Sequence, residues 1–287
     1  MKKICITVML CCLSFVGAWS QSRVLESLEF QSEILGRPVK YSVYLPDGYD
    51  SSTRSYPTLY LLHGWTDDET SWVQMGNMQP IVDDVIDSGK TVDMVVVMPD
   101  ARETWYVNAY DGKDSYEDMF FNELIPYMEK TYRLRKQTEY RAIAGLSMGG
   151  YGALLYAVHH PDMFSVCAPL SAAVYSEKVL TNTMKSRRGD LFRHLFGEKV
   201  FTDHWYKNSI LDLLDKIEAK QLSGVKFYID CGDDDALLYC SIAVHEKMNE
   251  KKIAHEFRVR DGNHCWTYWR TALPSILELL GRQFRRS

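Results

Sequence analysis

The sequence predicts that residues 21–287 form one α/β domain, with helices on both faces of a mostly parallel sheet. Short apolar runs bounded by turn residues alternate along the chain with longer segments of helical periodicity. This alternation is typical of parallel strands that are joined by helical crossovers. Apolar residues make up 46% of the 287 residues, enough for the sizeable core that such a domain requires.

Eight segments have the composition of strands, and we expect the first two to form a leading antiparallel pair. The expected strands cover residues 23–31, 39–45, 57–62, 94–98, 140–144, 164–168, 225–230 and 254–260. Most of the later strands are short and strongly apolar, as strands buried on both faces of a sheet are. The strand at 164–168 is expected to end before Pro169.

Five further segments have helical patterns, and they lie between or after the expected strands. They cover residues 78–88, 114–132, 148–159, 237–250 and 267–281. Residues 171–224 show no clear strand and are rich in helix formers, aromatic residues and basic residues. We expect this stretch to be a helical insert over the active site, with peripheral helices as the alternative.

Residues 1–20 have the pattern of a secretory signal peptide. Lys2 and Lys3 precede a long apolar run, and the small residues Ala18 and Ser20 precede the expected cleavage site. The apolar run is too short to span a bilayer, and no later segment is long and apolar enough to do so. We therefore expect export to the periplasm or the medium without stable membrane insertion; an uncleaved anchor is the alternative.

Charge and cysteine content exclude several classes of protein. The formal charge is −5 and acidic and basic residues are interspersed, so nucleic-acid binding has no electrostatic support. No Cys-x-x-Cys spacing occurs, and we expect neither a metal nor an organic cofactor. Four cysteines remain after signal cleavage, and the sequence leaves disulfides and free buried thiols open. They are Cys167, Cys231, Cys240 and Cys265.

A Gly-x-Ser-x-Gly motif stands between an expected strand and an expected helix. Gly145 and Gly149 lie two residues to either side of Ser147. In a sharp strand-to-helix turn, side chains at those two positions would collide, and glycine removes the collision. The context is the one in which a serine becomes a nucleophile. The alternative is a tight turn with an incidental serine.

Three polar residues follow expected strands in the order serine, aspartate, histidine: Ser147, Asp235 and His264. The carboxyl ends of parallel strands share one edge of the sheet, where ligands bind. A serine needs a base to remove its proton, and a carboxylate must orient that base. His264 is the expected base, with a surface-loop histidine as the alternative. Asp235 is the expected acid, with helix capping as its alternative role and Asp233 as second choice.

Backbone donors are needed for the oxyanion that forms when a serine attacks an ester. Met148 follows the serine and Trp65 follows His63-Gly64, so their N–H groups are the expected oxyanion hole. We expect His63 to organise this loop without taking part in acid–base catalysis.

Five motifs in the same order resemble the esterase D-like and feruloyl esterase branch of the α/β-hydrolase family. They cover residues 59–64 with Trp72, 97–100 with Trp105 and Tyr106, 145–150, 231–237, and 262–264 with Trp269 and Arg270. The branch includes acetylxylan esterases, S-formylglutathione hydrolases and mycolyltransferases. The resemblance implies the α/β-hydrolase fold and favours Asp235, because the family places its acid three residues after the glycine of this motif. In some feruloyl esterases a cysteine just before the nucleophile forms a disulfide with a cysteine just after the histidine. Cys265 follows His264 here, but Leu146 precedes Ser147, so this disulfide is excluded.

The expected substrate follows from the aromatic residues and from the signal peptide. Trp105, Tyr106, Trp205 and Trp266 are candidate substrate contacts, since aromatic faces suit sugars and phenolic rings. Export favours a serine carboxylesterase that acts on feruloyl or acetyl esters of plant polysaccharides. A general short-chain carboxylesterase, an acyltransferase and, remotely, a non-catalytic glycan-binding module are the alternatives.

Overall fold

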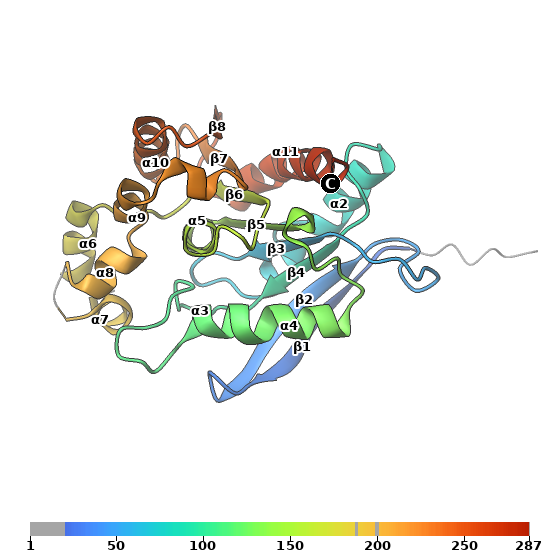
Figure 1. The fold of residues 1–287 in the computed structure, drawn as a ribbon, viewed down its shortest axis with the longest axis horizontal. Helices are drawn as coiled ribbons and strands as arrows, with labels where there is room; N and C mark the ends of the chain where they lie inside the picture. Colours follow the sequence, from blue (N-terminus) through green and yellow to red (C-terminus); the bar gives the residue numbers. More distant parts are fainter. Residues whose placement is uncertain (1–20, 187–188, 199–200, 287) are drawn as a thin grey trace, which may run out of the picture.

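A computed structural model describes residues 21–186, 189–198 and 201–286, and an eight-stranded sheet forms its centre (Figure 1). The strand order is β1-β2-β4-β3-β5-β6-β7-β8. The strands are β1 (Arg23–Ser32), β2 (Arg37–Leu45), β3 (Thr58–Leu62), β4 (Val95–Pro99), β5 (Arg141–Leu146), β6 (Val166–Leu170), β7 (Lys226–Gly232) and β8 (His255–Arg260). β1 and β2 form an antiparallel pair, β2 runs antiparallel to β4, and all other neighbours are parallel. The predicted sheet is therefore confirmed.

Helices lie on both faces of this sheet, as predicted. They are α1 (Ser71–Gln74), α2 (Met78–Asp87), α3 (Tyr116–Met119), α4 (Ile125–Thr131), α5 (Met148–His159), α6 (Glu177–Met184), α7 (Gly189–Phe196), α8 (Asp203–Asn208), α9 (Ile210–Lys216), α10 (Leu238–Glu250) and α11 (Trp266–Phe284). A π-helical turn, η1 (Phe120–Leu124), joins α3 to α4, and 3-10 turns occur at η2 (Thr138–Tyr140) and η3 (Ala219–Leu222).

Two hydrophobic clusters separate the faces, because successive strand residues point to opposite sides. In β3, Tyr60 and Leu62 join one cluster with α4, α5 and α10, whereas Leu59 and Leu61 join the other with α2 and α11. Figure 1 shows α2 and α11 beside each other on their side of the sheet, and the two helices are in direct contact.

One predicted strand boundary was wrong, and one predicted helix contains an irregular turn. β6 continues through Pro169, because Pro169 lies opposite Gly145 of β5 while the register with β7 passes over residues 168–169. The ladder with β7 is therefore interrupted at Pro169, which has no N–H to donate, while the pairing with β5 continues. The predicted helix at 114–132 is divided by η1, a π-helical turn that a 3.6-residue period does not reveal.

The described part of residues 171–224 contains α6 to α9 and η3, and no strand beyond β6 occurs there. Figure 1 shows α6, α7 and α8 beyond one end of the sheet. The predicted signal peptide at residues 1–20 lies outside the described residues. Among the helices that the structure does describe, none combines the length and apolar character that a bilayer crossing requires.

Candidate active site

Ser147 occupies a strained turn between β5 and α5. Its backbone has φ 54° and ψ −115°, a region that residues with a side chain rarely adopt. A Cβ at Gly145 would lie 2.5 Å from the Gly149 carbonyl oxygen, and one at Gly149 would lie 2.5 Å from the Leu62 carbonyl oxygen. The predicted collision on both sides of the serine is thus confirmed. The turn is held from outside by the Ser147 N–H, which donates to the Leu170 carbonyl at 2.9 Å.

His264 bridges Ser147 and Asp235. Its Nε2 lies 3.0 Å from the Ser147 Oγ, and its Nδ1 lies 2.9 and 3.0 Å from the two Asp235 carboxylate oxygens. A carboxylate can only accept, so Nδ1 carries the proton and Nε2 of the neutral ring accepts from the serine hydroxyl. This is the arrangement in which an imidazole can remove the serine proton.

Asp235 is buried, with 4% of its surface exposed, and it is held as a carboxylate. Burial opposes its ionisation, but hydrogen bonds from His264 and from the Leu237 N–H outweigh this and keep the Asp235 pKa below its usual value. The Leu237 N–H donates to Oδ1 at 2.7 Å. Asp235 therefore remains charged wherever His264 needs an acceptor.

Asp233, the second choice for the acid, has a different partner. Its Oδ1 accepts the Gly262 N–H at 2.9 Å, two residues before His264. Asp233 therefore ties the loop that carries His264 to the end of β7, and the hydrogen bonds of the His264 ring go to Asp235.

Two further residues support Asp235 and His264, and the sequence analysis missed the role of both. Ser171 is fully buried with φ 47°, and its side chain helps to keep the pKa of Asp235 below its usual value. The Ser171 hydroxyl accepts the Trp269 indole N–H at 3.1 Å, and the Trp269 ring packs edge-on to His264 at 4.9 Å. Ser171 directly follows β6, so the strand-end rule that selected Asp235 could also have selected it.

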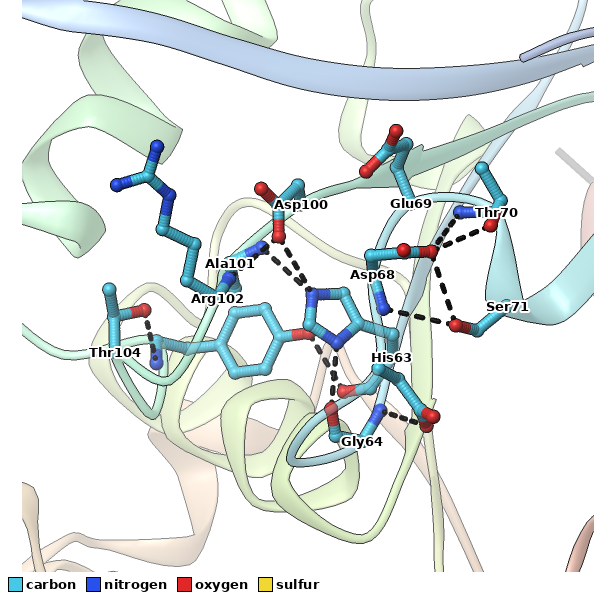
Figure 2. Close-up of polar contacts among 12 residues, drawn as sticks. His63, Gly64, Asp68, Glu69, Thr70, Ser71, Asp100, Ala101, Arg102 and Thr104 are labelled. Atoms are coloured by element: carbon cyan, nitrogen blue, oxygen red, sulfur yellow. Dashed lines mark hydrogen bonds and ion pairs between the residues drawn. The ribbon is translucent and has the colours of Figure 1, made fainter. Parts of the chain in front are cut away.

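His63 organises the loop after β3, as the sequence predicted. Figure 2 shows it between Gly64 and Ala101: its Nδ1 donates to the Gly64 carbonyl at 2.7 Å and its Nε2 accepts the Ala101 N–H at 2.8 Å. Because Nε2 accepts from a backbone N–H, the ring is neutral even though Asp100 Oδ1 lies 3.6 Å away. The Tyr106 hydroxyl donates to the His63 carbonyl at 2.9 Å, which fixes the loop further.

Of the two expected oxyanion donors, Met148 directly follows Ser147, and Trp65 belongs to a loop that reaches Ser147. Met148 is the first residue of α5, and the first N–H groups of a helix have no partner within it. Gly64 packs so closely that a Cβ built on it would lie 3.7 Å from the Ser147 Cβ, and Trp65 is the next residue. The Gly64 N–H donates to Asp67 Oδ2 at 3.3 Å, so this amide is turned into the loop.

The candidate substrate contacts occupy three different environments. Tyr106 is fully buried and supports the His63 loop, and its contact with the substrate stays a prediction. Trp105 and Trp205 are 4% and 3% exposed, and both line a pocket walled by aromatic residues. Trp266 is half-buried and packs edge-on to Trp72 at 5.2 Å on the α11 side.

The described cysteines are all free thiols. Cys167 and Cys231 are buried, whereas Cys240 and Cys265 are partly exposed. Side chains of metal-binding type gather at two places in the described part of the chain, around Glu117 and around Asp233. Neither group includes Ser147, His264 or Asp235.

The sheet order, the Ser147 turn and the contacts of His264 together define an α/β-hydrolase. A family model described as putative esterase matches residues 32–280, so the chain belongs to this esterase family and is a carboxylic ester hydrolase. The predicted family and fold are therefore confirmed.

Relatives and a solved structure agree with this assignment. A solved ferulic acid esterase superposes with a TM-score of 0.82 at 32% identity, covering 92% of this chain and 99% of the other. The endo-1,4-beta-xylanase/feruloyl esterase of Xylanibacter ruminicola is 35% identical over 53% of this chain, but the match spans only 22% of that protein. The acetyl esterase of Caldicellulosiruptor saccharolyticus is 23% identical over 81% of this chain and 86% of its own length.

Proposed function

We propose that the chain is an exported serine carboxylesterase that cleaves feruloyl or acetyl esters of plant polysaccharides through an acyl-enzyme. The observation that carries the proposal is the continuous hydrogen-bond chain from the Ser147 hydroxyl through His264 to Asp235. Support for the substrate comes from relatives named as feruloyl and acetyl esterases, and support for export comes from the pattern of residues 1–20.

In the proposed mechanism, Ser147 attacks the ester carbonyl while His264 Nε2 takes the hydroxyl proton. The Asp235 carboxylate stabilises the imidazolium that forms. The N–H groups of Met148 and Trp65 donate to the oxyanion, and each such donor contributes about 3 kcal/mol to the transition state. His264 then protonates the leaving alkoxide and next activates a water, which releases the acid and restores Ser147. No metal or organic cofactor enters these steps.

A cluster of aromatic side chains begins at the backbone of the Ser147 turn and encloses a cavity of about 10 Å³, room for about one water molecule. Tyr151 and Ala173 line it, and their N–H groups both donate to the Ser147 carbonyl at 3.0 Å, so the pocket wall begins at the nucleophile. Trp105 and Trp205 also line it, and among the described residues neither indole N–H has a hydrogen-bond partner. A buried donor without an acceptor is costly, so the two indole N–H groups suit the ring oxygens of a feruloyl group. The side chains that line the cavity must move apart to admit that ring.

The test is the hydrolysis of methyl ferulate by the mature protein, with Ser147→Ala as the matched variant. The proposal predicts release of ferulate that falls by at least about 1,000-fold in Ser147→Ala. Turnover of p-nitrophenyl acetate without release of ferulate would restrict the substrates to short acyl esters. Ester hydrolysis that persists in Ser147→Ala would refute the mechanism, and transfer of the acyl group to a sugar hydroxyl in place of water would identify an acyltransferase.

A further inference from the structure

A cluster of two histidines and a glutamate lies at the end of α5 opposite to Ser147. Glu117 belongs to α3, His159 is the last residue of α5, and His160 follows it. α5 has 12 residues, so about 17 Å of helix separates the cluster from Ser147. The mechanism of ester hydrolysis uses none of the three side chains.

Both imidazoles face the same carboxylate oxygen. His159 Nδ1 lies 2.7 Å from Glu117 Oε1, and His160 Nε2 lies 3.0 Å from the same atom. One atom from each residue lies within 4.8 Å of the other two, so a single ion can reach all three.

The second nitrogen of His159 is already committed. His159 Nε2 lies 2.7 Å from the Lys207 carbonyl oxygen, which can only accept, so Nε2 carries a proton. In the neutral ring, Nδ1 would present a lone pair to the Glu117 carboxylate, so either a proton or a metal ion lies between Nδ1 and the carboxylate. A backbone carbonyl on the far nitrogen is the usual partner of a metal-binding histidine, since it fixes the tautomer and the ring plane.

The cluster is partly enclosed, and the two histidines are the groups that face the negative charge of the Glu117 carboxylate. Glu117 is buried, and among the described residues its ion-pair partners are His159 and His160, with neither lysine nor arginine. The His160 ring packs on Phe121 with ring centroids 3.7 Å apart, which limits its rotation. The His160 side chain remains 36% exposed, so an ion can enter from the solvent side.

We propose that Glu117, His159 and His160 bind one divalent transition-metal ion of the zinc class, with water in the fourth position. The ligand atoms are His159 Nδ1, His160 Nε2 and a Glu117 carboxylate oxygen, a set of nitrogen and oxygen donors that zinc accepts. Ligands of one zinc ion lie about 3.3 Å apart, so the pairs open by a few tenths of an ångström as the ion replaces the bridging protons. The ion would join α3 to the end of α5 and, through Lys207, to α8.

The test is a calorimetric titration of the mature protein with Zn²⁺, together with thermal unfolding in the presence and absence of Zn²⁺. We expect one Zn²⁺ per chain and a rise in Tm. His160→Asn should weaken Zn²⁺ binding by at least about tenfold and abolish the rise in Tm. His194→Asn is the matched control, because His194 is another partly exposed histidine that lies against a carboxylate, 2.8 Å from Asp111 Oδ2, and it should behave as the wild type.

Either of two results would overturn the proposal. The first is the absence of Zn²⁺ binding by the folded wild-type protein, which would leave protons alone between the histidines and Glu117. The second is equal binding by the wild type and by both His160→Asn and Glu117→Gln, which would place the ion elsewhere. Ester hydrolysis is measured in the same samples and is expected to be unchanged in His160→Asn, so the outcome is independent of the proposed mechanism.

Discussion

Two regions beside Ser147 differ in what lines them: backbone atoms line one, and aromatic side chains line the other. On one side, Gly145, Gly149 and the His63 loop bring backbone into such close contact that no side chain fits between them. On the other side, the pocket under the helices of residues 171–224 is lined by aromatic side chains, two of which hold N–H groups without partners in the described structure. The Ser147 turn is therefore defined by backbone contacts and the neighbouring pocket by side chains, and we propose that the first serves catalysis and the second substrate recognition.

The largest effect on kcat is expected from replacing Asp235, the carboxylate that orients His264. Asp235→Asn should lower kcat by about 10,000-fold, because an asparagine can favour the wrong His264 tautomer while leaving the geometry intact. Asp233→Asn is the control and should stay within about twofold, since an amide oxygen still accepts the Gly262 N–H. Steady-state kinetics with p-nitrophenyl acetate measure both. A loss of the same size in Asp233→Asn would reverse the roles given to the two residues.

Adding a single methyl group at Gly149, where backbone atoms pack closely, should destabilise the protein. Gly149→Ala places a Cβ 2.5 Å from the Leu62 carbonyl oxygen and 2.6 Å from that of His63. We expect a loss of about 3 kcal/mol or more in the free energy of unfolding, because backbone atoms cannot yield as side chains do. Gly224→Ala, where a Cβ meets nothing within 4 Å, should be neutral in the same urea titration. Equal stability of the two variants would show that the close contact is not needed.

Replacing Ser171 tests whether its hydroxyl helps Asp235 to orient His264. Ser171→Ala removes the hydroxyl that helps to lower the Asp235 pKa and that accepts the Trp269 N–H. We expect kcat to fall by about tenfold with little change in KM, because the variant disturbs orientation and not substrate binding. Without the Ser171 hydroxyl the Asp235 carboxylate holds the His264 proton more strongly, so the acid limb of the rate profile, which reports protonation of His264, should move to higher pH. An unchanged pH profile would reduce Ser171 to a structural residue.

The smallest effect on activity is expected from a change in the aromatic pocket, and its size should depend on the substrate. Trp205→Phe keeps an aromatic ring in the pocket but removes one of the two indole donors. We expect kcat/KM for methyl ferulate to fall about tenfold, the value of one hydrogen bond, while p-nitrophenyl acetate hydrolysis changes little. A parallel loss for both esters would mean that the pocket does not hold the acyl ring.

The part of the site that depends on short-range pattern could be predicted from the sequence. Glycines two residues to either side of Ser147 and polar residues at strand ends are local signals, and the structure brings Ser147, His264 and Asp235 together. The eight strands follow from the same alternation of apolar runs and helices.

The rest depends on packing between distant segments. Nothing in the sequence distinguishes buried Tyr106 from the half-buried Trp266, because both are aromatic residues beside catalytic motifs. The hydrogen bond from Trp269 to Ser171 joins residues 98 positions apart, and no periodicity reports such a contact. The π-helical turn at residues 120–124 also has no signature in an apolar pattern.

The central claim is that the turn, His264 and Asp235 make Ser147 a nucleophile, and labelling with a fluorophosphonate tests it directly. Such a reagent reacts with an activated serine hydroxyl, and mass spectrometry of the digested protein identifies the modified residue. The account predicts a single adduct on Ser147 that is lost in Ser147→Ala and strongly slowed in Asp235→Asn. A folded, esterase-active protein that carries no label, or carries it on another residue, would contradict the account.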